Sequence, residues 1–312
     1  MNSVQCLSAI RDNMKKAVVG KDEVIDELLI ALICSGHVLV EDLPGLGKTT
    51  LVSALASSLG CSFQRIQFTP DVLPSDITGF NMVQLQTGEQ VFHPGSVHHQ
   101  IILADEINRA SPKTQSALLE AMQERQVTVD GKTYPLPQPF MVLATQNPVE
   151  MAGTYPLPEA QMDRFLMRIS VGYPNHEEEL DIVRRRRGVS EQVHLQPVAE
   201  VADILAIQNM LGDIHVDDAI LEYIVHIVEV TRRMEGVLMG VSPRGSIALT
   251  KAACAAAILD GRSYVLPDDV KRMAVSVLAH RLVLKNRSGA EGTTAADVIA
   301  GILRDTRVPK MK

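Results

Sequence analysis

Apolar positions follow one pattern in the first half of the chain. Short apolar runs with the character of buried strands alternate with stretches in which apolar residues recur at helical spacing. Such alternation is typical of a parallel sheet with helices on both faces, so we expect an α/β region here. We predict strands at residues 38–40, 63–68, 100–104 and 140–145, and helices at 24–32, 51–59 and 111–125.

Two insertions interrupt this alternation, and each has the form of a β-hairpin. In both, short strand-like runs flank a turn that contains glycine. We predict that residues 83–86 pair with 90–92, and that 127–129 pair with 133–134.

The second half has a different pattern, because strand signals fade after Val171 and helical spacing dominates. Asn175 with Glu178 resembles a helix cap. We therefore expect an α/β domain at 1–172 and a helical domain at 173–312, with a mobile loop at 286–294. Helices are predicted at 176–187, 198–211, 217–234, 243–260, 267–284 and 296–304.

Composition narrows the class of protein. The net charge of −7 argues against nucleic acid as an obligate partner, since such proteins usually carry a basic excess. No apolar run approaches the ~20 residues needed to span a bilayer, and the N-terminus lacks a signal-peptide pattern, so a cytoplasmic location is expected. The cysteines form no C-x-x-C pair and read as buried free thiols: Cys6, Cys34, Cys61 and Cys254.

Residues 42–49, DLPGLGKT, carry the strongest chemical signal. They join a predicted strand to a predicted helix, and this context with Gly-Lys-Thr indicates a P-loop. Gly45 and Gly47 can turn amide N–H groups toward phosphates, Lys48 can meet phosphate charge, and Thr49 can ligate Mg²⁺. The pattern departs at its first position, where Asp42 replaces glycine.

Two acids end a later strand, in the run Ile101–Glu106, and this is the Walker B form. Behind a P-loop, Asp105 is expected to hold Mg²⁺ and Glu106 to polarise the attacking water. A strand capped by solvated acids is the alternative. Asn147 also ends a strand, where its amide could orient the same water or favour a turn before Pro148.

Three arginines are candidates for contacts with phosphate. Arg164 or Arg168, near the rim of the sheet, could reach the γ-phosphate of a neighbouring subunit, although a surface ion pair is the simpler reading. Arg244 follows Ser242-Pro243 at a predicted helix start and could face phosphate from the second domain, or be solvated.

Other charged clusters are given less weight. The basic run Arg184–Arg187 reads as a solvated or subunit-contact face. His93, His98 and His99 do not match common zinc spacing. Mg²⁺ accompanying nucleotide is therefore the metal that we expect.

Taken together, these motifs resemble the AAA+ ATPases and, among them, the MoxR family. Residues 41–49 are similar to the MoxR P-loop, which often has a non-glycine at its first position, and 104–110 are similar to its Walker B segment. Asn147 matches the sensor 1 position, Arg164 the arginine finger and Arg244 sensor 2. Gly245 stands where the family often has alanine, and glycine should weaken that helical turn slightly.

The resemblance implies an AAA+ P-loop core with a central parallel sheet and two hairpin insertions, followed by an all-helical lid. It implies catalytic roles for Glu106, Asn147, Arg164 and Arg244, and metal contacts for Thr49 and Asp105. ATP or ADP would be bound by Val19, Gly20, Pro44, Gly45, Leu46, Gly47, Lys48, Thr49 and Thr50.

The resemblance also implies a homo-hexameric ring that hydrolyses ATP to remodel protein clients, often proteins with von Willebrand factor A domains. The alternatives are the motor subunit of a metal chelatase and a helicase-like nucleic-acid motor of the same branch. A scaffold that binds nucleotide without useful hydrolysis is a further class, which the acids at 105–106 and Arg164 disfavour.

Overall fold

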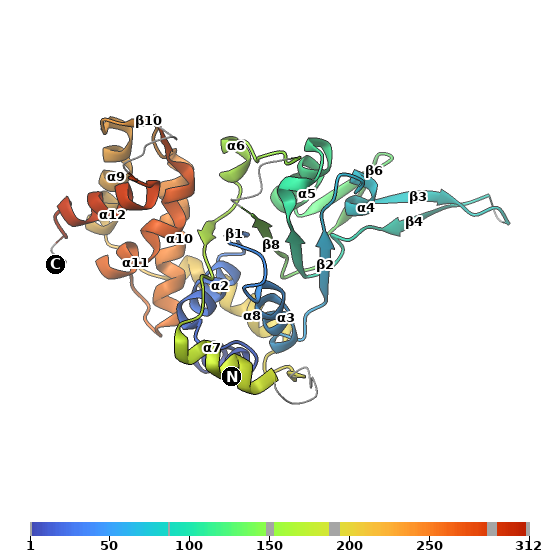
Figure 1. The fold of residues 1–312 in the computed structure, drawn as a ribbon, viewed down its shortest axis with the longest axis horizontal. Coiled ribbons are helices and arrows are strands. Elements are labelled where there is room, and N and C mark those ends of the chain that lie inside the picture. Colours follow the sequence, from blue (N-terminus) through green and yellow to red (C-terminus); the bar gives the residue numbers. More distant parts are fainter. Residues whose placement is uncertain (1, 87, 148–152, 187–193, 286–291, 310–312) are drawn as a thin grey trace.

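The computed structural model describes residues 2–86, 88–147, 153–186, 194–285 and 292–309. An α/β core and a mostly helical C-terminal region lie side by side (Figure 1). The loop predicted at 286–294 falls largely outside these residues.

The core is built on a five-stranded sheet in the order β2-β5-β8-β1-β9, and all of its pairings are parallel. The four predicted strands are confirmed to within about a residue, while the three-residue β9 is too short to show a sequence pattern. The strands are β1 (Val38–Glu41), β2 (Phe63–Gln67), β5 (Ile101–Asp105), β8 (Met141–Gln146) and β9 (Met167–Ile169).

Alternate side chains of the central strands pack into two separate apolar clusters, one on each face of the sheet. Val38 and Val40 of β1 pack into one cluster, while Leu39 between them packs into the other. This period of two is what a sheet buried on both faces requires. The first face is covered by α1 (Ser3–Lys15), α2 (Asp22–Ile33) and α3 (Lys48–Ser58), and the second by α4 (Pro74–Thr78) and α5 (Pro112–Glu124).

Both predicted hairpins are present, and the first projects away from the core (Figure 1). Its strands are β3 (Gly79–Val83) and β4 (Gln90–Pro94), so the strand predicted at 83–86 begins and ends earlier than expected. The chain turns at Leu85 and Gln86 instead, and the Gln84 N–H donates to the Glu89 carbonyl across the base of this turn. The second hairpin pairs β6 (Gln126–Val129) with β7 (Lys132–Pro135).

The C-terminal region is helical, as predicted, with one small addition. The helix predicted at 267–284 is wrong beyond Leu278, where a 3-10 turn, η3 (Ala279–Arg281), leads into a two-residue strand. That strand, β11 (Val283–Leu284), pairs with β10 (Val237–Met239). The helices are α7 (His176–Arg186), α8 (Val201–Asn209), α9 (Asp218–Arg233), α10 (Pro243–Leu259), α11 (Pro267–Leu278) and α12 (Ala295–Asp305).

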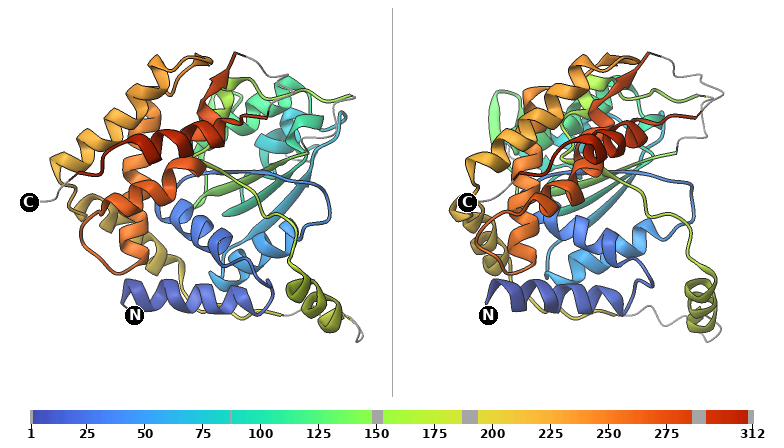
Figure 2. Two further views of the ribbon diagram at one scale, coloured as in Figure 1. Left: turned by 60° about the vertical axis from the view of Figure 1, so that its left-hand side comes forward. Right: turned by 90° about the vertical axis from the view of Figure 1, so that its left-hand side faces the viewer.

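Apolar packing joins the two regions. Helix α10 lies against α1 and α2, and α11 contacts β9, so that one cluster of buried residues runs through both regions (Figure 2). An ion pair of 2.7 Å between Arg272 and Asp26 supports this contact. Helix α7 lies beside the N-terminal helices, where the Arg185 guanidinium donates to the Lys16 carbonyl, and its predicted cap of Asn175 with Glu178 is confirmed.

The cysteines are partly as predicted. Cys6 and Cys254 are buried, whereas Cys34 and Cys61 are half-buried. All are free, and burial raises the pKa of each thiol, to about 11 for Cys61 and Cys254. Among the helices that the structure describes, none combines the length and the apolar character needed to cross a bilayer.

Candidate functional site

The glycine-rich turn after β1 has the backbone shape of a P-loop. Gly45 and Gly47 have φ angles of +85° and +79°, which side-chain-bearing residues rarely adopt. Helix α3 begins at Lys48 directly after this turn, so its N-terminal N–H groups face the loop. The Lys48 ammonium donates to the carbonyls of Asp42 and Leu43, at 3.0 and 3.2 Å.

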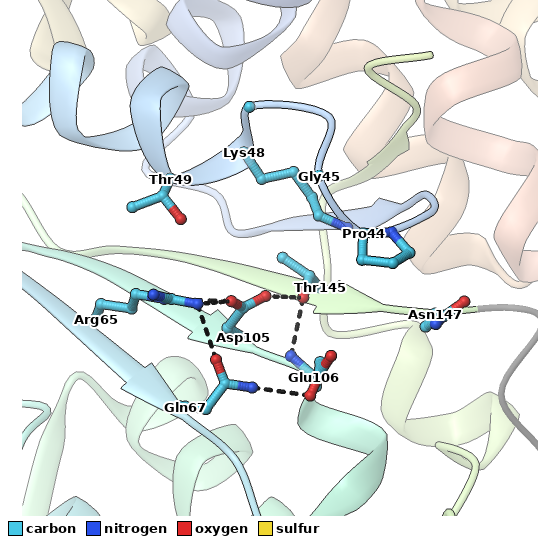
Figure 3. A pocket seen from close by; sticks show the side chains of 11 residues that line it. Pro44, Gly45, Lys48, Thr49, Arg65, Gln67, Asp105, Glu106, Thr145 and Asn147 are labelled. Atoms are coloured by element: carbon cyan, nitrogen blue, oxygen red, sulfur yellow. Dashed lines mark hydrogen bonds and ion pairs between the residues drawn. The ribbon is translucent and has the colours of Figure 1, made fainter. Parts of the chain in front are cut away.

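A pocket of about 230 Å³ opens between this loop and the carboxyl ends of β2, β5 and β8 (Figure 3). Ligand pockets usually measure ~300–1,000 Å³, so this one is suited to the charged end of a larger ligand. The sheet order explains why the loop after β1 lies near the acids after β5. Strand β8 lies between β1 and β5, and the carboxyl ends of all three strands lie at one edge of the sheet. The lining residues are Pro44, Gly45, Gly47, Lys48, Thr49, Arg65, Gln67, Asp105, Glu106, Thr145 and Asn147.

Hydrogen bonds hold the two acids in place. The Thr145 hydroxyl donates to Asp105 Oδ1 at 2.7 Å and accepts from the Glu106 N–H at 2.9 Å (Figure 3). Glu106 has φ +58°, a left-handed conformation that costs energy for a residue with a side chain. Strain of this kind is often kept where it aims a functional side chain.

Sequence reasoning missed two polar residues of β2 that bind these acids. The Arg65 guanidinium donates to Asp105 Oδ2 at 2.6 Å, and the Gln67 amide donates to Glu106 Oε2 at 2.8 Å. Arg65 and Gln67 are also bonded to each other, so the four side chains form one chain (Figure 3). The available signal was polar residues two apart at the end of a strand next to β5, where a parallel sheet places functional groups.

Asp42, the departure from the P-loop pattern, has a structural role. Its buried carboxylate accepts from the Ser170 hydroxyl at 2.7 Å and from the backbone N–H groups of Val171 and Gly172. A glycine could supply none of these bonds. The first residue of the loop therefore fastens it to the segment that leaves β9 for the C-terminal region.

The structure does not bring all predicted residues to this pocket. Asn147 lines it together with the loop and the acids. Val19 and Gly20 lie in the turn after α1, where the Glu178 side chain packs against Gly20. Leu46 and Thr50 are not among the lining residues.

The three candidate arginines lie elsewhere. Arg168 on β9 is bound to Glu41 of the same chain at 2.9 Å. Arg164 lies in a separate groove along α5, and its guanidinium donates to the Leu119 carbonyl at 2.8 Å. Arg244 is 69% exposed and lies 3.9 Å from the carboxylate of Asp163, the residue before Arg164. Arg244 therefore does not line the pocket of its own chain in this structure, and its contact with phosphate stays a prediction.

The donor set of the pocket fits a nucleoside triphosphate with a divalent cation. One wall offers N–H groups and an ammonium, which suit phosphate oxygens, and the other offers carboxylates and hydroxyls, which suit Mg²⁺.

Comparison with known proteins agrees with this fold and site. Residues 37–167 match the ATPase family associated with various cellular activities (AAA), and residues 229–302 match an AAA lid domain. The chain is 42% identical over 307 residues to Chaperone MoxR1 of Mycobacterium tuberculosis, which covers 96% of this chain and 81% of that protein. The chain belongs to the MoxR family of AAA+ ATPases. It is also similar to the uncharacterised protein YeaC of Bacillus subtilis, with 50% identity over 298 residues, 96% of this chain and 93% of YeaC.

A solved structure has the same fold as this chain. The crystal structure of a candidate ATPase from Cytophaga hutchinsonii superposes with a TM-score of 0.92 at 41% identity, covering 99% of this chain and 96% of that one. The predicted fold class, an AAA+ core with a helical lid, is thereby confirmed.

Proposed function

We propose that this MoxR-family protein hydrolyses ATP with Mg²⁺ and uses the energy to remodel protein partners in a chaperone-like way. The observation that carries the proposal is the pocket of Figure 3, where Asp105 and Glu106 face Lys48 and Thr49. AAA+ proteins in general bind nucleotide with Mg²⁺, and Chaperone MoxR1 bears the chaperone name.

Each residue of the pocket has a distinct role in this proposal. The N–H groups of the loop and Lys48 bind the phosphates, and Thr49 and Asp105 hold Mg²⁺, which when bound neutralises phosphate charge. Glu106 accepts a proton from the attacking water, and Asn147 orients that water. Gln67 and Arg109 both bind the Glu106 carboxylate, at 2.8 and 3.1 Å, and fix its direction.

A neighbouring subunit completes the reaction site. Arg164 and Arg244 lie close to the same residue, Asp163, and away from the pocket of their own chain. We assign both to the nucleotide of the adjacent subunit, where they stabilise the charge of the transition state. This assignment requires a ring, and a homo-hexamer is the form usual for AAA+ proteins.

Four further features are those that the MoxR family implies. Val19 and Gly20 would border the adenine, and 173 would begin the lid. A cytoplasmic location and a client with a von Willebrand factor A domain complete the proposal.

A substrate trap tests the proposed function. Glu106→Gln should bind ATP, fail to hydrolyse it and retain the client in a pull-down made with ATP. Glu222→Gln, a change on the exposed face of α9, is the matched control. Enrichment of a von Willebrand factor A domain protein over that control supports the proposal. A tetrapyrrole-chelatase partner supports the chelatase alternative, and enrichment equal to the control contradicts client remodelling.

A further inference from the structure

Arg281 is a charged residue buried where the two domains meet. It belongs to η3, after α11, and its side chain is only 4% exposed. Few arginines are buried to this extent without a dense set of partners, because an unpaired buried charge is costly. The hydrogen-bond partners of Arg281 therefore indicate its role.

The partners of Arg281 lie mainly on one short segment of the core. Its Nε donates to Asp163 Oδ1 at 2.7 Å, and its two other nitrogens donate to the carbonyls of Phe165 and Leu166, at 2.7 and 3.0 Å. These acceptors bracket Arg164 on both sides. One buried side chain of the second domain thus fixes the backbone that carries the candidate finger.

The neighbours of Arg281 show how closely this contact is built. A methyl group added at Gly245 would lie 3.3 Å from Arg281 Cδ and 2.2 Å from a methyl of Val241, so alanine would not fit without movement. The glycine that differs from the usual residue of the family therefore leaves room mainly for Val241, with Arg281 beside it. His280 contacts the Phe165 carbonyl and Arg281, and burial beside that guanidinium lowers its pKa.

The same segment is also in contact with the second candidate arginine. Arg244, at the start of α10, lies 3.9 Å from Asp163 Oδ2, while Arg281 binds Oδ1. The exposed Arg244 and the buried Arg281 both belong to the second domain. Asp163 therefore joins that domain to the chain immediately before Arg164.

We propose that Arg281 is a positioning residue that ties the segment 163–166 to the second domain, so that the position of Arg164 depends on that domain as well as on α5 of the core. This proposal rests on the proposed role of Arg164 toward a neighbouring subunit. A rotation of the lid in one subunit would then be transmitted to the nucleotide site of the next, because the segment that carries the finger is held by Arg281 of the second domain as well as by Leu119 of the core.

Mixed rings test this role apart from any effect on the variant's own nucleotide site. Arg164→Ala subunits keep a pocket but lack the finger, and Lys48→Ala subunits keep the finger but lack a working pocket. Their mixture should regain ATPase activity. If Lys48→Ala also carries Arg281→Gln, the regained rate should fall at least tenfold. Asp163→Asn, which keeps the shape of that side chain, should lower it in the same way.

Arg262→Gln in the Lys48→Ala subunit is the matched control. Arg262 is also paired with a buried aspartate, Asp269, but this pair lies wholly within the second domain. It should leave the regained rate within about twofold. Subunit exchange is checked by native mass spectrometry.

The outcomes separate the two proposals. No recovery in the parent mixture, despite exchange, would remove the in-trans role of Arg164 and the present inference with it. Recovery that survives Arg281→Gln would overturn the inference and leave the in-trans role intact.

Hydrogen exchange provides a readout that does not depend on activity. In Arg281→Gln, peptides covering 163–169 should exchange at least tenfold faster, while peptides covering β5 keep the exchange rate of the parent protein. Equal acceleration in both would mean that Arg281 only stabilises the fold, and the proposal would be wrong.

Discussion

The P-loop pocket and the edge of the core around Asp163 both carry many charged side chains, but the partners of those side chains differ. In the pocket, side chains from neighbouring strands bind one another, as in the chain of Arg65, Asp105, Gln67 and Glu106. At the edge, Asp163 binds the buried Arg281 at 2.7 Å, while Arg244 is 69% exposed and lies 3.9 Å from the same carboxylate. Among the described residues lining the pocket, the cations are Lys48 and Arg65. In the proposed function, each chain therefore supplies a nucleotide pocket and, separately, arginines for the pocket of a neighbouring subunit.

Removing the finger should have the largest effect. We expect Arg164→Ala to lower the rate of phosphate release by ~10³, because an arginine finger typically contributes 10³–10⁵. ATP affinity, measured by equilibrium titration, should stay within about threefold. Arg168→Ala is the comparison, since Arg168 is bound to Glu41 and should matter less. A larger loss in Arg168→Ala would assign the finger to Arg168 instead.

Removing the proposed base, Glu106, tests the P-loop pocket itself. Glu106→Gln should slow hydrolysis by ~10², the lower end expected for general-base catalysis, since the amide can still accept from Gln67 and Arg109. The measurement is single-turnover hydrolysis together with ATP titration. Hydrolysis at the rate of the unmodified protein would show that another group activates the water.

Arg65 offers a smaller test of how the pocket accepts metal. Its ion pair with Asp105 is partly exposed, and such pairs contribute up to ~1 kcal/mol, which corresponds to about fivefold in affinity. In Arg65→Gln, the Mg²⁺ concentration for half-maximal binding of a non-hydrolysable ATP analogue should fall by about that factor. A rise would mean that Arg65 assists the metal or the phosphates rather than competing for Asp105.

The smallest expected effect is on stability at low pH, and it concerns His37, which joins β8 of the pocket to α5. Buried His37 accepts from the Val142 N–H and donates to the Met122 carbonyl of α5, the helix whose Leu119 binds Arg164. Burial lowers the pKa of His37 to about 4. Unfolded histidine titrates near pH 6.5, so this contribution is complete above that pH and is lost as the pH falls toward 4.

We therefore expect urea unfolding to show stability falling with acid, His37 adding at most ~1.4 kcal/mol per pH unit. His37→Gln, which stays neutral, should be less sensitive between pH 6.5 and 5. An unchanged pH dependence would show that the lowered pKa of His37 does not contribute to stability in this way.

The sequence alone predicted most of the residues that line the pocket, but few of the contacts around Asp163. The loop at 42–49, Asp105, Glu106 and Asn147 were found because each follows a recognisable strand, and parallel strands collect such ends at one edge. Arg65 and Gln67 were missed although their strand was predicted, because the sequence did not show that β2 lies beside β5. The roles of Asp42 and Arg281 depend on contacts more than 100 residues apart in the chain, which no local pattern shows.

The most direct test of the shared site is ATP hydrolysis per subunit as the protein is diluted, with the oligomeric state followed by mass photometry. If each chain holds two incomplete halves, the rate per subunit falls toward the Arg164→Ala level as rings dissociate, while ATP affinity stays within about threefold. A rate per subunit that remains constant when single chains predominate would contradict the account.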